Sequence, residues 1–219
     1  NVDADTLTSV CWLDLTKEPV IVYCPNTQGN YYSIEFIDFY NNLCGSFYCG
    51  PDDISQRNFL VTQPGYTDSI PNDTQHIVSN TQYILCYVRL MVPQTSQLND
   101  VKTIQSNFTI KPLSLHGETN TYTGVNVMPD FPKIEIETPI DFYNALSRIM
   151  ALIPPPEEDA AILNILKKIG VIPGGSLLEE MFTNEELAAI EAGYNEGRML
   201  IQYSKDQLQQ PLAGGFNSI

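Results

Sequence analysis

Residues 31–40, YYSIEFIDFY, decide the fold class of this chain. Successive side chains of a β-strand point to opposite faces, so this stretch divides into two alternating sets. One set is Tyr32, Ile34, Phe36, Asp38 and Tyr40, and the other is Tyr31, Ser33, Glu35, Ile37 and Phe39. Both sets are partly apolar, which is typical of a central strand of a β-sandwich.

Segments of the same kind lie on both sides of this strand. They are rich in aromatic and β-branched residues, and they are 6–15 (TLTSVCWLDL), 19–24 (PVIVYC), 58–62 (NFLVT), 76–79 (HIVS) and 83–92 (YILCYVRLMV). Turn residues separate them, among them the Pro64-Gly65 pair, which favours a type II turn. The pattern predicts an antiparallel β-sandwich over residues 1–113.

The pattern changes after Pro112. Residues 114–137 are polar and predict a loop or hairpin connection, whereas residues 138–219 carry the signals of a helical segment. The expected fold class is therefore α+β, a β-sandwich followed by about three α-helices.

Helix-capping signals place these helices. Thr138 and Pro139 are typical of the start of a helix, and Gly170 is typical of the end of a second helix that begins near residue 157. Thr183 and Glu186 have the spacing of a capping box, which predicts the start of a third helix.

The net charge of −15, with 26 acidic and only 11 basic residues, restricts the classes of partner. Sequence-independent nucleic-acid binding and adsorption to anionic lipid both depend on clustered Lys and Arg, and the basic residues here are scattered. No run reaches the roughly 18 apolar residues that a spanning helix needs. We therefore expect no nucleic-acid partner and no membrane span.

The ends of the sequence carry two further signals. Asn1 is not an initiator Met, and no apolar signal segment follows it, which is consistent with removal of an upstream segment. Secreted, periplasmic and virion-associated locations therefore stay open. Residues 209–219, QQPLAGGFNSI, end without a recognisable element, which indicates the front part of a longer two-domain protein.

Five cysteines, an odd number, cannot all pair within one chain. Cys11, Cys24 and Cys86 alternate with apolar residues in expected strands, so we expect them to be buried and reduced. Cys44 and Cys49 flank four residues and could close a hairpin disulfide in an oxidising compartment. Because the sequence has no CxxC motif and its two histidines lie far from the cysteines, we expect no metal site and no cofactor.

Taken in order, these segments resemble a known family, the domain of unknown function 1254. Residues 3–15 (DADTLTSVCWLDL) and 18–22 (EPVIV) are similar to its opening signature. Further similar landmarks are the strand at 31–42, the turn at 64–66, the strand that contains Arg89, residues 100–113 and IGVIPGG at 169–175.

The resemblance implies a jelly-roll-like sandwich of viral type, followed in longer members by a second sandwich, the domain of unknown function 1214. It attaches no reaction to the chain. The sequence departs from the family pattern at Asp3, Thr8 and Asn30, where the family usually has Asn, Tyr and Arg, and in the loop at 49–57. A polar pocket built by that Tyr and Arg would be altered here.

Three of the candidate site residues lie in or beside the first and last strands. Asp5 and Thr6 could bind a ligand at the rim of the sandwich, or could form a turn that fixes the entry of the first strand. Arg89 lies in an apolar strand, where its charge needs a partner. That partner is either the carboxylate of a substrate or an acid of the protein itself.

Asp38 is the fourth candidate. With Asp14 and Glu35 it could form a carboxylate cluster for acid–base chemistry or calcium binding, or all three could be solvated strand residues. No Gly-x-Ser-x-Gly elbow is present, so the sequence assigns no catalytic residue. Trp12, the only tryptophan, is expected to be buried in the sandwich.

Two hypotheses of function follow. The first is a non-enzymatic structural or binding module of a symmetric assembly, of viral or cell-surface type, whose partners are further copies and a C-terminal sandwich of the same chain. The second is a hydrolase-like enzyme that acts on a small carboxylate-bearing or hydrophobic compound near Asp5, Thr6 and Arg89. An unpaired, inward-pointing Arg89 would favour the enzyme, and a flat apolar patch would favour the assembly.

Overall fold

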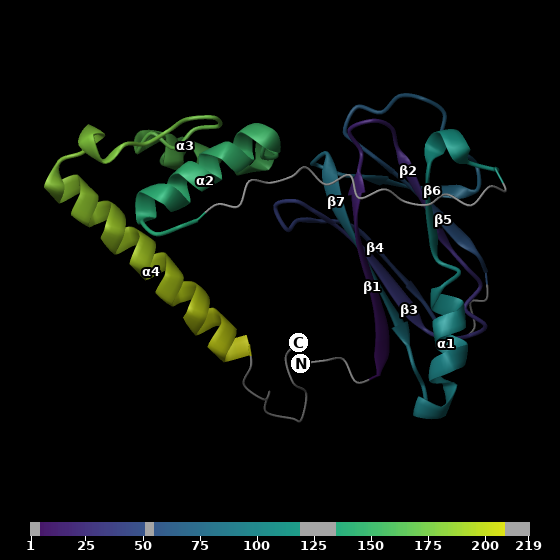
Figure 1. Ribbon diagram of the computed structural model, residues 1–219. Helices are drawn as coiled ribbons and strands as arrows, with labels where there is room; N and C mark the ends of the chain where they lie inside the picture. Colours follow the sequence, from purple (N-terminus) through teal and green to yellow (C-terminus); the bar gives the residue numbers. More distant parts are fainter. Residues whose placement is uncertain (1–4, 51–54, 119–134, 209–219) are drawn as a thin grey trace. The chain divides into compact units, whose positions relative to one another are not determined.

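The computed structural model describes residues 5–50, 55–118 and 135–208 of the chain. The chain divides into two compact units, residues 2–131 and 132–219, which we call the sandwich unit and the helical unit (Figure 1). The boundary between them, with most of the connection expected at 114–137, lies outside the described residues.

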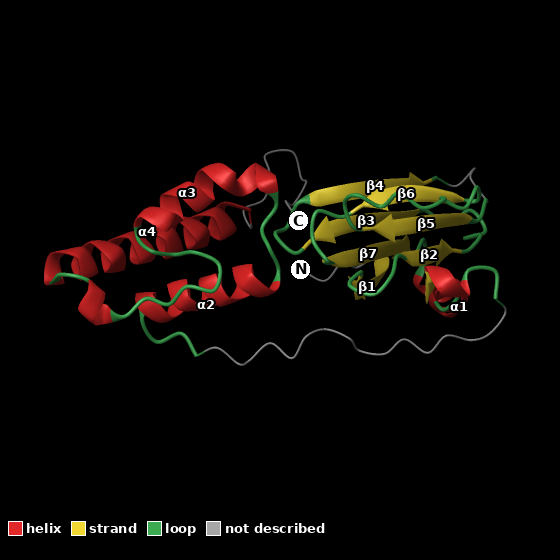
Figure 2. Ribbon diagram, turned by 90° about the horizontal axis from the view of Figure 1, so that it is seen from above, coloured by secondary structure: helices red, strands yellow, loops and turns green. Residues whose placement is uncertain are grey.

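The sandwich unit contains two four-stranded sheets (Figure 2). Sheet A is antiparallel throughout, and its strands in spatial order are β1 (Thr6–Asp14), β7 (Tyr83–Met91), β3 (Tyr32–Asp38) and β4 (Leu43–Cys49). Sheet B is mixed, because β5 and β6 run parallel, and its order is β6 (Thr74–Val78), β5 (Arg57–Thr62), β2 (Val20–Cys24) and β8 (Thr109–Pro112). The predicted α+β class and the β-sandwich are confirmed.

Two strands and one helix of this unit escaped the sequence patterns. β4 and β8 lie in segments that show no clear alternation, and the short helix α1 (Leu98–Gln105) lies in a segment that was predicted as part of the sandwich. α1 contributes the buried side chains of Val101 and Ile104 to the core of the sandwich.

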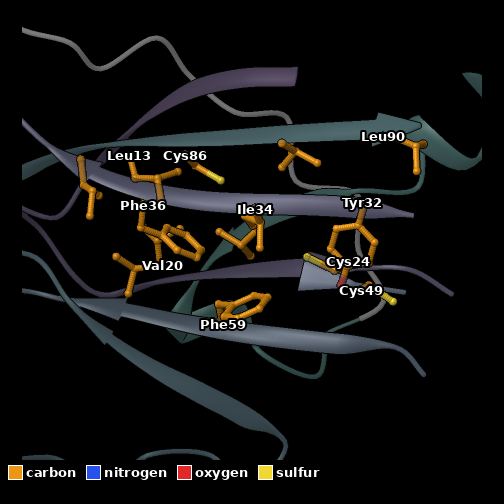
Figure 3. Close-up of a cluster of buried hydrophobic side chains, with 14 of the residues drawn as sticks. Leu13, Val20, Cys24, Tyr32, Ile34, Phe36, Cys49, Phe59, Cys86 and Leu90 are labelled. Carbon is orange, nitrogen blue, oxygen red and sulfur yellow. The ribbon is translucent and has the colours of Figure 1, made fainter. Parts of the chain in front are cut away.

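The core lies between the two sheets and is closely packed with aromatic rings (Figure 3). Phe36 of sheet A is 5.4 Å from Phe59 of sheet B, measured between ring centres. Tyr32, Ile34 and Phe36, which belong to one of the two alternating sets of β3, are fully buried. The position of β3 inside sheet A, between β7 and β4, agrees with the prediction of a central strand.

The prediction that Trp12 is buried is wrong. β1 is an edge strand of sheet A and turns Leu13 into the core, so the alternation sends Trp12 to the outer side. The indole is 39% exposed and packs at 5.7 Å against the Phe39 ring.

All five cysteines are free thiols. Cys44 and Cys49 lie on the same strand, β4, about 16 Å apart at roughly 3.3 Å per residue. A disulfide needs Cα atoms about 4.4–6.8 Å apart, so the hairpin bridge does not form. Cys24 and Cys86 are buried as expected, whereas Cys11 is only partly buried.

Within the described residues the helical unit contains three α-helices. Four short 3₁₀ turns are also present, two in each unit. The helices are α2 (Pro139–Leu152), α3 (Ala160–Lys168) and α4 (Asn184–Leu208), and the 3₁₀ turns are η1 (Thr95–Gln97), η2 (Leu113–Leu115), η3 (Glu157–Asp159) and η4 (Glu179–Met181). Among the described residues no helix combines the length and hydropathy that a membrane crossing requires.

The predicted caps of the helical unit are present. Thr138 and Asp141 form a reciprocal capping box at the start of α2, and hydrogen bonds from Thr138 lower the pKa of the Asp141 carboxyl. Thr183 donates from its backbone and its hydroxyl to the Glu186 carboxylate at the start of α4. Gly170 follows α3 with φ = 85°, a left-handed conformation that favours glycine.

The core of the helical unit is small, and α4 contributes little to it. One cluster of buried residues comprises Ile140, Met150, Val171 and Leu177, and Leu187 and Ile190 of α4 are partly buried against it. Further along α4, the side chains of Met199, Leu200, Ile201 and Tyr203 are all exposed. The surface of α4 therefore includes an apolar stretch that the described residues do not cover.

Phe36 is buried and Trp12 is partly exposed, so replacing each by alanine should lower the free energy of unfolding by different amounts. Phe36→Ala removes a fully buried ring, so we expect it to lower the free energy of unfolding by about 3–5 kcal/mol. Trp12→Ala removes a partly exposed ring and should cost about 1–2 kcal/mol. Urea denaturation of both variants measures the difference, and equal losses would contradict the outward position of Trp12.

Candidate functional site

Arg89 lies near the middle of the outer surface of sheet A. Its guanidinium is 3.5 Å from a carboxylate oxygen of Glu35 on the neighbouring strand β3. The guanidinium carbon also lies 4.5 Å from the centre of the Tyr87 ring, within the range of a cation–π contact. The side chains of Arg89 and Glu35 remain 28% and 21% exposed. Arg89 is therefore paired, and it points away from the core.

The surface around this ion pair is mainly uncharged, and we call it the outer face of sheet A. The strand registers place its residues in rows, which are Thr8–Arg89–Ser33–Tyr48, Val10–Tyr87–Glu35–Ser46 and Trp12–Leu85–Ile37–Leu43. Val10, Leu43 and Tyr48 are each more than half exposed. These three side chains lie on the two outer strands, β1 and β4, so exposed apolar groups occur at both edges of the face. Exposed apolar surface of this kind is typical of an interaction surface when it is contiguous, and Tyr87, Leu85 and Ile37 lie between the two edges.

Thr6 and Asp5 lie at one end of this face. Thr6 begins β1 opposite Met91, two residues from the row of Arg89. Its hydroxyl is buried and makes no hydrogen bond to the described residues. Asp5 is exposed, and its carbonyl oxygen accepts a 2.6 Å hydrogen bond from the Val92 amide, which continues the β1–β7 pairing.

Asp38 lies at the opposite end of β3, five residues and roughly 16 Å from the row of Arg89. Its carboxylate is buried and accepts hydrogen bonds from the Tyr40 amide (2.9 Å) and from the Asn42 amide (2.8 Å) and side chain (3.0 Å). These bonds organise the turn between β3 and β4. The structure thus brings Thr6 and Arg89 to one face and leaves Asp38 apart from them.

The three acids considered as a cluster have separate partners. Asp14 accepts hydrogen bonds from the backbone and hydroxyl of Thr16, Glu35 pairs with Arg89, and Asp38 binds its own turn. Within the described ranges, no group of three or more His, Cys, Asp or Glu side chains has the geometry to hold a metal ion.

A second polar cluster, which the sequence analysis missed, lies on the outer side of sheet B. The Tyr23 hydroxyl is 2.9 Å from Nδ1 of His116, and Nε2 of the same ring is 3.2 Å from an oxygen of Asp73. The other Asp73 oxygen accepts a 2.9 Å hydrogen bond from the Asn58 side chain. The result is a continuous Tyr–His–Asp chain of hydrogen-bonding groups.

The roles in this chain follow from which groups can donate. The Asp73 carboxylate only accepts, so a neutral His116 that bonds to it carries its proton on Nε2 and accepts from Tyr23 at Nδ1. Burial, and the nearby charge of Asp73, raise the pKa of the Tyr23 hydroxyl. The arrangement therefore keeps Tyr23 protonated and its ring fixed.

A surface pocket of about 370 Å³ adjoins Tyr23. It is lined by polar side chains from β2, β8 and the loops beside them, among them Asn26, Gln56, Asn107 and Lys111. The Lys111 ammonium lies 5.8 Å from the centre of the Tyr23 ring and donates a 2.7 Å hydrogen bond to the Glu118 carbonyl. The pocket thus combines one cation, amide groups and an aromatic wall.

Comparison with known proteins identifies a family and a similar structure. The family model described as "Protein of unknown function (DUF1254)" matches residues 1–112. A search of curated proteins found no match.

The crystal structure of the VPA0106 protein from Vibrio parahaemolyticus is similar to this chain. The two align with a TM-score of 0.68 and 19% sequence identity over 96% of this chain and 51% of that chain. The chain therefore spans about half the length of that protein, and at this identity the likeness concerns the fold.

Proposed function

The chain belongs to the DUF1254 family of proteins of unknown function, and we propose that its sandwich unit is an interaction module that pairs with a second copy through the outer face of sheet A. The observation that carries the proposal is the set of exposed apolar side chains, Val10, Trp12, Leu43 and Tyr48, on the same face as a paired Arg89. Of the two arrangements weighed from the sequence, this is the one that favours assembly over catalysis at Arg89.

The charges of this face suit a symmetric contact. Arg89 and Glu35 cancel each other in a chain whose net charge is −15, so this face avoids the repulsion expected between other acidic surfaces. Because the two charges are neighbours near the middle of the face, a twofold axis between them would place each Arg89 opposite the Glu35 of the other copy.

The size of the face is adequate for a dimer. Four strands about 4.8 Å apart and nine residues of β1 give an area roughly 15–20 Å wide and roughly 30 Å long. With the relief of the side chains this approaches the ~800 Å² per partner of a standard interface. Trp12 and Tyr48 are both exposed on this face, and tryptophan and tyrosine frequently anchor such interfaces.

We assign α4 a separate role as the seat of a further domain of a longer chain. Its exposed Met199, Leu200, Ile201 and Tyr203 are apolar over much of the helix circumference, which is unfavourable in water. The length of the Vibrio parahaemolyticus protein, about twice the aligned region, supports such an arrangement. Phe216 and Ile219, in the segment 209–219, lie outside the described residues.

A small-molecule site is the second candidate function, and the pocket beside Tyr23 is the observation that favours it. Lys111 supplies a positive charge for a carboxylate, and the Tyr23 ring supplies an apolar wall. The Tyr23–His116–Asp73 chain could transfer a proton to or from a bound molecule. This moves the enzyme hypothesis from Arg89 to the outer side of sheet B.

The dimer proposal predicts a difference between two valine substitutions. Val10→Glu places a charge in the outer face, and we expect it to convert the dimer to a monomer. Val78→Glu, at an exposed position in sheet B, is the matched control and should stay dimeric. Sedimentation equilibrium of both variants and of the original chain, each at about 100 µM, measures the molecular mass. An original chain that is monomeric at this concentration would have a dimer Kd above ~10⁻⁴ M, which would refute the proposal.

A charge exchange tests the contact more specifically. Arg89→Glu alone leaves two acids side by side and should abolish the dimer. The double substitution Glu35→Arg with Arg89→Glu restores the pair within each copy and between copies, so we expect the dimer to return. A monomeric double variant with native circular dichroism would show that the pair does not lie at the interface.

The pocket predicts binding of an aromatic carboxylate, for which benzoate is a suitable probe. We expect benzoate to shift the amide NMR signals of Lys111 and Gly117, because the carboxylate approaches the ammonium group. Lys111→Gln should weaken binding about tenfold, whereas Lys102→Gln on the exposed surface of α1 should not change it. Equal shifts in both variants would argue against a site at Lys111.

A further inference from the structure

We propose that Cys11 and Cys86, which face each other across β1 and β7, are a peroxide-reactive thiol pair that closes to a reversible disulfide. The two residues are direct partners in the register of these strands. The proposed assembly does not use them, because both side chains lie on the inner side of sheet A.

The backbone holds the two cysteines at a distance that suits a disulfide. The Leu15 amide donates to the Gln82 carbonyl at the end of this ladder, so residues of β1 an even number of positions from Leu15 are hydrogen-bonded to β7. Cys11 is therefore in a hydrogen-bonded pair with Cys86, for which the Cα atoms are about 5.5 Å apart. Disulfides typically span Cα separations of about 4.4–6.8 Å.

The Cys11 thiol also reaches the backbone of Cys86. Its Sγ lies 3.9 Å from the carbonyl oxygen of Cys86, to which the thiol donates a hydrogen bond. A rotation of the side chains, with the strands in place, is enough to bring one sulfur toward the other.

The two cysteines differ in the way that a reactive and a resolving thiol differ. Cys11, on the edge strand, is partly exposed, and the hydrogen bond from Cys86 lowers the pKa of its thiol. Cys86 is buried directly beside it. An accessible thiolate next to a second cysteine is the usual arrangement of a peroxide-sensitive pair.

The other described thiols are poorer candidates. Burial raises the pKa of Cys24 to about 12 and also raises the pKa of Cys44. Cys24 and Cys49 are buried beside Tyr32, away from the β1 edge (Figure 3). Cys11 is therefore the thiol that we expect to react first.

The reaction balances in two steps. The Cys11 thiolate attacks one peroxide oxygen, so that an S–O bond forms, the O–O bond breaks, and the departing oxygen leaves as water or an alcohol after it takes a proton. The sulfur of Cys86 then attacks the Cys11 sulfenic acid, forms the S–S bond, and releases the hydroxyl as water with the Cys86 proton. The two thiols lose two electrons, and the peroxide gains them.

Trypsin separates these cysteines from the others, so peptide mapping gives a clear test. Cleavage after Lys17, Arg57 and Arg89 places Cys11 in peptide 1–17, Cys86 in peptide 58–89, and the other three cysteines in peptide 18–57. After treatment of the folded chain with one equivalent of hydrogen peroxide, we expect a mass loss of about 2 Da and a link between peptides 1–17 and 58–89. Dithiothreitol should reverse both changes.

Two variants distinguish the pair from general oxidation. In Cys86→Ser the reaction should stop at the sulfenic acid of Cys11, which dimedone traps, whereas Cys44→Ser should still lose about 2 Da. Oxidation confined to peptide 18–57, or a Cys11 that passes to sulfinic acid in the original chain without linking to Cys86, would overturn the proposal. The mapping of the original chain decides the question even if the Cys86 variant does not fold.

Discussion

The hydrogen-bonded register of β7 is the constraint on which both of the proposed sites on sheet A of this chain depend. β7 pairs with β1 on one side and with β3 on the other. Because side chains alternate, a shift of one residue would exchange its inner and outer sets. In the observed register Cys86 faces the core opposite Cys11, and Arg89 faces outward beside Glu35. The thiol pair and the outer face of sheet A therefore rest on the same backbone hydrogen bonds.

Local sequence patterns predicted most of the fold because each depends on neighbouring residues. The alternation of β3 and the capping boxes at Thr138 and Thr183 are signals of this kind. β4 escaped prediction because Gly45 and the adjoining register shift break its alternation. α1 has only eight residues, so its stability depends on the packing of Val101 and Ile104 rather than on its own sequence.

The sites were less predictable, because they depend on which strands become neighbours. The sequence showed that Arg89 needs a partner, and only the order of sheet A selects Glu35 from the available acids. The Tyr23–His116 bond joins residues 93 positions apart, so no local pattern could reveal it. Trp12 was misplaced for a related reason. Alternation shows that a strand has two faces, but the sheet decides which face the second sheet covers.

An edge strand with exposed apolar side chains is prone to uncontrolled association, because its free backbone groups can pair with any other strand. β1 is such a strand, with Val10 and Trp12 exposed on its outer side. The side chain of Gln105 on α1 donates to the Thr8 carbonyl (3.2 Å) and to the Ser9 hydroxyl (2.9 Å). These bonds occupy part of the free edge, so further strands are hindered there while the outer face stays open. The proposed dimer therefore associates through side chains rather than through backbone pairing at this edge, and pairing through one face limits the number of partners to one.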